Sequence, residues 1–75
     1  MFSKETIVKK GLEELMRLLR YTVEEPPFGN TFRNQAFGII QFLVTLMPDR
    51  EAEFTVIWNT WQESFENVYK ILKNA

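Results

Sequence analysis

The chain contains no cysteine and no histidine. Without them it has no thiol nucleophile, no disulfide, none of the common zinc ligands and no usual general base near neutral pH. Most classes of enzyme depend on at least one of these groups. We therefore predict a protein that is not an enzyme and that carries no metal or other cofactor.

Carboxylates are the remaining candidates for acid and base chemistry. Two groups stand out: Glu24 with Glu25, and Asp49 with Glu51 and Glu53. The first pair precedes two prolines in an expected connector, and the second suits the first turn of a helix, where the helix dipole favours negative charge. The second group does not fit a calcium loop, because its sixth position is not glycine and Thr60 replaces the bidentate glutamate. A carboxylate-only enzyme or a carrier of a small apolar ligand would need a true cavity between the helices.

Charge of neither sign predominates: nine basic and ten acidic residues give a formal net charge of -1, so no strong field draws the chain to nucleic acid or to an anionic membrane. Charged residues from Lys9 to Glu14 interrupt the first segment, which argues against a secretory leader. The uncharged stretch 34–48 is shorter than the roughly 20 residues of a membrane span. With no cysteine, these features favour a cytoplasmic protein that does not enter a membrane.

The 75 residues, 45% of them hydrophobic, are enough for one folded domain over 1–75 and too few for two. A domain of this size without disulfides or metal depends on dense packing or on self-association. Seven Phe, two Trp and two Tyr supply large apolar areas for both.

Three helices are predicted from the spacing of the apolar residues, at about 4–22, 32–47 and 50–73. Ser3 is a good N-cap for the first helix, Asn30 or Thr31 for the second, and Asp49 for the third. The prolines of the 24–30 connector end the first helix, and we expect Phe28 to tuck over the core there. The fold class is thus all-α, a compact three-helix bundle.

The second helix is apolar around nearly its whole circumference. Its polar stripe is narrow and uncharged: Asn34, Gly38, Gln41 and Thr45. Gly11 of the first helix is either a tolerated glycine or a place where another backbone comes close.

The third helix repeats large apolar residues in alternating steps of four and three, which is typical of a coiled-coil seam. This seam comprises Phe54, Trp58, Trp61, Phe65, Val68 and Leu72. Aromatic residues at this spacing, with Tyr69 beside them, fill the bundle interior or contribute to an interface.

One central seam cannot hide all of this apolar surface, so we expect a leftover contact surface covered by a second copy or by another protein. The candidate interface residues are Phe37, Ile39, Phe42, Leu46, Trp58 and Trp61. The leading hypothesis is a non-catalytic interaction module, a small regulator or inhibitor that acts as a homodimer.

An alternative hypothesis is a nucleic-acid accessory protein that uses a basic face of the first helix. That face would consist of Lys9, Lys10, Arg17 and Arg20. Glu13 and Glu14 interrupt it, and interleaved charges usually form a solvated helix surface, so nucleic acid is the weaker alternative.

Overall fold

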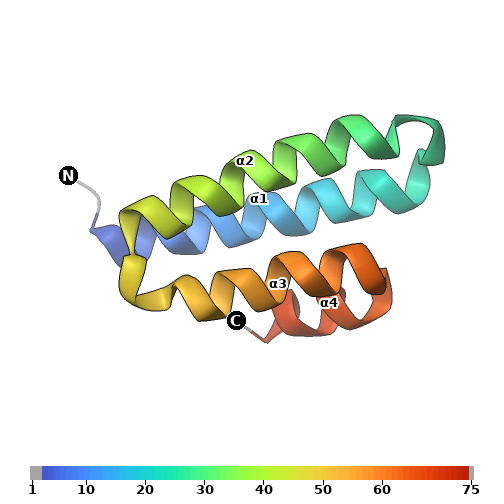
Figure 1. Ribbon diagram of the computed structural model, residues 1–75. Coiled ribbons are helices and arrows are strands. Elements are labelled where there is room, and N and C mark those ends of the chain that lie inside the picture. The colour runs from blue at the N-terminus through green and yellow to red at the C-terminus, as the bar shows by residue number, and fades with distance from the viewer. Residues whose placement is uncertain (1–2, 75) are drawn as a thin grey trace.

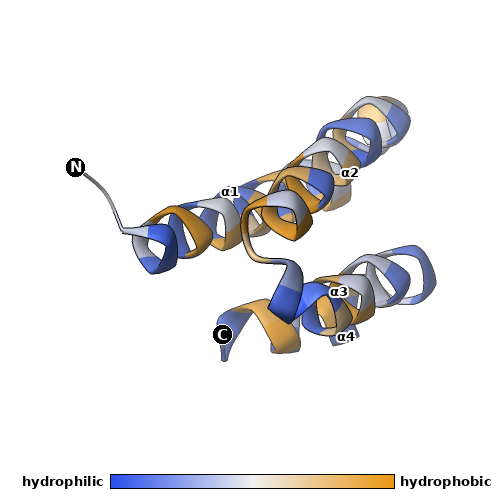
Figure 2. Cartoon of the chain, turned by 60° about the vertical axis from the view of Figure 1, so that its left-hand side comes forward, coloured by the Kyte–Doolittle hydropathy of each residue, from blue (hydrophilic) through white to orange (hydrophobic). Residues whose placement is uncertain are grey.

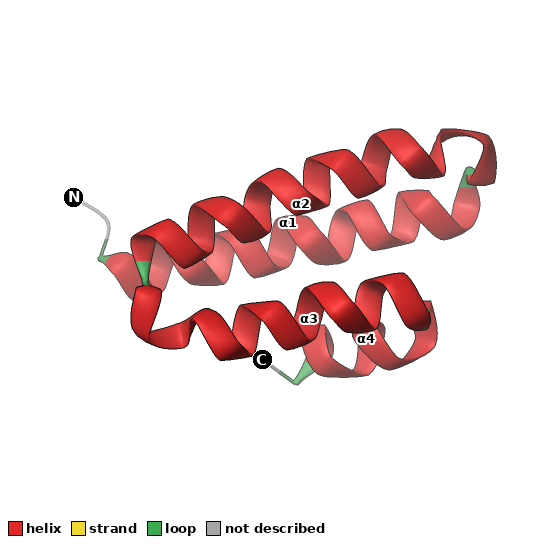
Figure 3. Cartoon of the chain, in the orientation of Figure 1, coloured by secondary structure: helices red, strands yellow, loops and turns green. Residues whose placement is uncertain are grey.

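A computed structural model describes residues 3–74 of the chain. Within that range it is all-helical, with four α-helices and two short 3₁₀ turns, and it has no strand (Figure 3). The α-helices are α1 Lys4–Glu24, α2 Gly29–Leu46, α3 Glu51–Glu63 and α4 Phe65–Lys73. The 3₁₀ turns Pro26–Phe28 and Pro48–Arg50 join α1 to α2 and α2 to α3. No helix in this part of the chain combines the length and the apolar character that a membrane crossing requires.

The helices run up and down beside one another. In Figure 1, α1 and α2 form an antiparallel pair, α3 returns beside α2, and α4 folds back along α3. α1 packs against α2 and α4, and α3 also packs against α2 and α4. Hydrophobic residues recur along all of these helices, whereas the turn between α2 and α3 is hydrophilic (Figure 2). The core therefore lies where the four helices face one another.

The prediction of one continuous helix over 50–73 is wrong, because the chain turns at Ser64. Ser64 has an extended backbone, its Oγ accepts a hydrogen bond from the Asn67 amide at 3.2 Å, and its own amide donates to the Thr60 carbonyl at 2.8 Å. A continuous helix of 24 residues would be about 36 Å long. The turn instead brings Val68 and Leu72 back into the core cluster.

The predicted helix ends also need correction. α1 continues to Glu24 and α2 begins at Gly29, with Phe28 in the N-cap position rather than Asn30 or Thr31. Asp49 does not cap α3, since it belongs to the 3₁₀ turn and no side chain caps this helix. Phe28 does not tuck over the core: the proline-led turn leaves it exposed. Ser3 caps α1 as predicted, and its Oγ accepts from the Thr6 amide at 3.1 Å.

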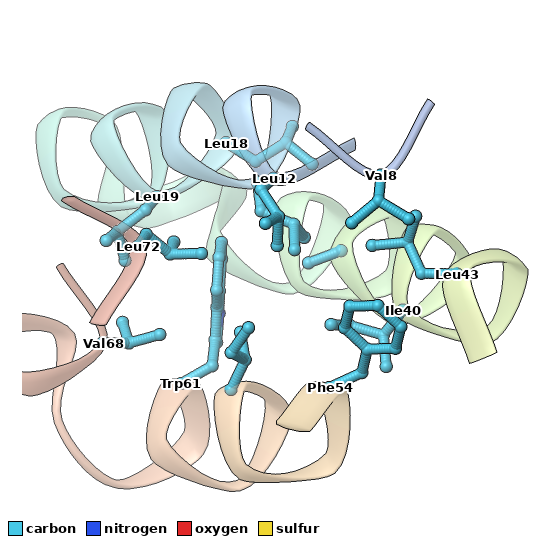
Figure 4. Packing of buried hydrophobic residues seen from close by; sticks show 13 residues of the cluster. Val8, Leu12, Leu18, Leu19, Ile40, Leu43, Phe54, Trp61, Val68 and Leu72 are labelled. Carbon is cyan, nitrogen blue, oxygen red and sulfur yellow. The ribbon is translucent and has the colours of Figure 1, made fainter. Parts of the chain in front are cut away.

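One hydrophobic cluster joins all four helices (Figure 4). In the close view, Trp61 projects from α3 toward α1, and Phe54 lies beside Ile40 of α2. The buried apolar residues are Val8, Leu12, Leu15, Leu18, Leu19, Ala36, Ile40, Leu43, Phe54, Ile57, Trp61, Val68 and Leu72. The buried Thr22 hydroxyl donates to the Leu18 carbonyl at 2.8 Å. Among residues 3–74, no buried side-chain nitrogen or oxygen lacks a hydrogen-bond partner.

Gly11 marks the tightest contact between α1 and α2. A Cβ at this position would lie 2.9 Å from Leu43 Cδ2, closer than carbon atoms pack. The glycine therefore allows a fully buried leucine of α2 to reach the surface of α1. Gly11 is thus a site of close approach between helices rather than a merely tolerated glycine, although the group that approaches it is a side chain and not a backbone.

Candidate functional site: exposed apolar surfaces

The interface residues expected from the sequence do not share one environment. Phe42 is 55% exposed and Phe37 is 44% exposed. Ile39, Leu46 and Trp58 are half-buried and pack against the core. Trp61 is only 2% exposed, so it is a core residue and belongs to no surface of the single chain.

Phe37 and Trp58 form an aromatic pair between α2 and α3. Their ring centroids are 5.2 Å apart, and the Arg33 guanidinium lies 5.9 Å from the Trp58 ring centroid. Arg33 also donates to Gln62 Oε1 at 2.6 Å, which ties α2 to α3 a second time. These contacts hold Phe37 in place while nearly half of its ring surface stays in solvent.

Next to Arg33, the exposed side of α2 includes an uncharged surface, here called the α2 outer face. It consists of Asn34, Phe37, Gly38, Gln41, Phe42 and Thr45, all of which are exposed. Beside it, Ile39 and Phe42 line a shallow groove of about 520 Å³ between α1 and α2. A helix face with six exposed positions and no ionised group is unusual for a surface that meets only water.

A second apolar surface lies on the opposite flank, between α1 and α4. This flank groove has a volume of about 480 Å³ and is lined by Leu19, Arg20, Val23, Glu24, Phe65, Glu66 and Tyr69. Val23, Phe65 and Tyr69 are all exposed, Val23 most of all. Like the groove between α1 and α2, which Lys10 and Glu14 also line, the flank groove has charged side chains of both signs at its rim.

Periodicity alone does not reveal the flank groove, because it assigns Phe65 to the core seam. The helix break at Ser64 changes the phase of the apolar pattern, so that Val68 and Leu72 turn inward while Phe65 stays exposed. The sequence does carry a signal for this break. Ser64 is a preferred N-cap, and Glu66 then falls in the first turn of a new helix.

The basic residues of α1 are divided between two surfaces. Lys9, Arg17 and Arg20 line a groove of about 650 Å³ together with Arg50, but Glu5 and Glu13 line it as well. Lys10 lines the groove on the α2 side. Arg17 donates to both carboxylate oxygens of Glu14, and these hydrogen bonds raise the pKa of its guanidinium. The structure therefore does not form a continuous cationic face from the four residues.

Within residues 3–74, no three Asp or Glu side chains come close enough together to hold a metal ion. The grooves described above are open to solvent rather than enclosed. They offer surfaces for contact with another macromolecule, and they do not provide the closed apolar cavity that a small-ligand carrier needs.

Comparisons of the chain with protein-family models, with curated protein sequences and with solved structures yield no match.

Proposed function

We propose that the chain is a non-catalytic protein-interaction module, a small regulator or inhibitor that binds another protein through an exposed apolar surface and that forms a homodimer. The observation that carries this proposal is the exposure of large apolar side chains at two separate places, the α2 outer face and the flank groove. Exposed groups of apolar side chains rimmed by polar residues are typical of surfaces that contact another macromolecule.

The flank groove is the surface we assign to the other protein. Val23 projects from α1, and Phe65 and Tyr69 from α4, so side chains of two helices border one hollow. Interfaces are anchored by a few apolar or aromatic side chains that fill such hollows, surrounded by polar groups that fix orientation. Arg20, Glu24 and Glu66 supply that polar rim.

The α2 outer face is the surface we assign to self-association. Its six residues carry no charge, whereas Arg20, Glu24 and Glu66 line the flank groove.

Capture experiments with matched variants test the assignment of the flank groove. The immobilised chain is exposed to cell extracts, enriched proteins are identified by mass spectrometry, and binding of the purified candidate is then measured by calorimetry. Tyr69→Glu places a charge beside the groove and should weaken binding at least tenfold. Val56→Glu changes a more exposed apolar residue of α3 that lies outside the groove, and it should bind like the wild type.

Two outcomes would contradict the proposal. Equal loss of binding in both variants would show that the contact is not specific to the flank groove. Salt-sensitive binding of duplex or single-stranded nucleic acid, lost in the Lys9→Glu, Arg17→Glu double variant, would favour the alternative function instead.

A further inference from the structure

Four of the exposed positions of α2 have the spacing of a helix–helix seam. Asn34, Gly38, Gln41 and Thr45 follow one another in steps of four, three and four residues, the pattern by which one helix packs along another. Phe37 and Phe42 lie on either side of this seam. No helix of the chain itself covers the seam, because these six residues are all exposed.

Gly38 has no function in the packing of the single chain. A Cβ at this position would meet no atom within 4 Å, in contrast to Gly11, where Leu43 occupies that space. Glycine weakens an exposed helix relative to alanine. What it provides at the centre of a seam is a place where the backbone of a second helix can approach closely.

The polar groups of the seam are compatible with burial. The Thr45 hydroxyl already donates to the Gln41 carbonyl at 2.9 Å, so covering it leaves no unsatisfied donor. The amide side chains of Asn34 and Gln41 each contain donors and an acceptor, and they can therefore pair with amides or hydroxyls of another copy.

We propose that the α2 outer face binds the same face of a second copy of this chain, with the two α2 helices antiparallel. This deepens the self-association part of the proposed function and rests on it. The seam is symmetric about the midpoint between residues 39 and 40. A two-fold axis at that point places Asn34 opposite Thr45 of the second copy, and Gly38 opposite its Gln41.

The same axis gives both phenylalanines a position in the interface. A two-fold axis perpendicular to the plane of an antiparallel helix pair relates each flank of the seam to the same flank in the other copy. The two Phe37 rings, each supported by its Trp58, then close one edge of the seam, and the two Phe42 rings close the other. Phe37 and Phe42 of both copies become buried in this arrangement.

A second copy fits this face better than a charged partner does. In a two-fold interface every residue near the axis approaches its own copy, so an ionised group there would meet a like charge. The α2 outer face contains no such group. The antiparallel arrangement also places opposite ends of the two helix dipoles side by side.

Sedimentation equilibrium of the full chain tests for the dimer. The wild type should sediment as a dimer at micromolar concentration, and Gly38→Arg should shift it to monomer with unchanged helical circular dichroism, because the added side chain has open space in the single chain. Val56→Arg, the matched control on α3, should remain dimeric. A monomeric wild type, or a dimeric Gly38→Arg variant, would overturn the inference.

Cross-linking tests the orientation, since the natural chain has no cysteine. Asn34→Cys and Thr45→Cys chains are mixed and treated with a short bis-maleimide. The mixture should give cross-linked dimers, whereas each variant alone should give none, because equivalent positions are then about 16 Å apart along the helices. Cross-linked dimers from either variant alone would indicate a parallel pair and refute the proposed register.

The two proposals fail in different ways. A chain that is monomeric but still loses its captured partner in Tyr69→Glu refutes the dimer and leaves the flank groove assignment standing. A chain that dimerises as described but captures no protein refutes that assignment alone.

Discussion

The two sides of α2 differ in what covers them, and polarity accounts for only part of that difference. On the inner side, Ala36, Ile40 and Leu43 are buried against the other helices. On the outer side, Phe42 is exposed although it is as apolar as its buried neighbours. Hydrophobicity alone therefore does not decide which residues form the core of a small chain. The positions of the neighbouring helices decide it.

The largest expected difference in stability is between a glutamate introduced on the inner side of α2 and one introduced on its outer side. Ile40→Glu buries a carboxylate without a partner, which costs about 4 kcal/mol, comparable to the roughly 4–11 kcal/mol total stability of a chain of this size. We expect this variant to unfold. Phe42→Glu should keep its helicity in circular dichroism and lose only self-association. Similar unfolding of both variants would contradict the distinction between the two sides.

A leucine in place of each helical glycine sharpens the same comparison. Gly11→Leu forces a side chain into the space of Leu43 and should destabilise the fold by about 2 kcal/mol. Gly38→Leu meets open space and should stabilise the single chain by about 0.5–1 kcal/mol through helix propensity. Urea unfolding at several low protein concentrations separates this gain from any loss of association. Equal effects at the two positions would show that α1 and α2 are not packed as described.

Removing the N-cap of α4 tests how much the turn at Ser64, which places Val68 and Leu72 in the core, contributes to stability. Ser64→Ala deletes the hydroxyl that accepts from the Asn67 amide and should lower the free energy of unfolding by about 1 kcal/mol. Ser3→Ala removes the equivalent bond at the start of α1, where a frayed turn uncovers little core, and should cost less. Urea unfolding of both variants measures the difference. A larger loss for Ser3→Ala would contradict it.

The ion pair at the start of α3 should contribute least, because both of its side chains are partly exposed to solvent. The hydrogen bonds from Arg50 lower the pKa of the Glu53 carboxyl below its ordinary 4.5. A lowered pKa means that the pair stabilises the fold above that ordinary value and ceases to do so as the pH falls through the lowered one. Glu53→Gln should therefore cost roughly 0.3 kcal/mol at neutral pH and nothing in acid. A loss that persists in acid would indicate packing rather than charge.

Much of the fold follows from local signals in the sequence. Ser3 and the apolar spacing after it predict α1 closely, and Pro48 marks the end of α2 within two residues. The third predicted helix shows where such signals are insufficient. Ser64 is a preferred N-cap residue, but serine is also tolerated inside a helix, and only the packing of Val68 and Leu72 in the core decides that a new helix begins here.

The candidate surfaces were predictable only in part. The crowding of apolar residues on α2 predicts that some of them remain uncovered, and Phe42 and Phe37 are indeed exposed. The sequence could not predict that Trp61 is buried and Trp58 only half-buried, because both lie at seam spacing and differ only in the helix that faces them. The flank groove depends on where α4 docks on α1, a contact between segments distant in the chain.

The unequal burial of the two tryptophans makes their intrinsic fluorescence informative. Trp61 is enclosed by the core, whereas Trp58 lies directly behind Phe37 at the edge of the α2 outer face. With Trp58 replaced by phenylalanine, the remaining emission follows unfolding. With Trp61 replaced instead, the emission of Trp58 reports whether that edge is exposed to solvent or covered. The chain thus carries two natural optical probes, one for folding and one for events on its surface.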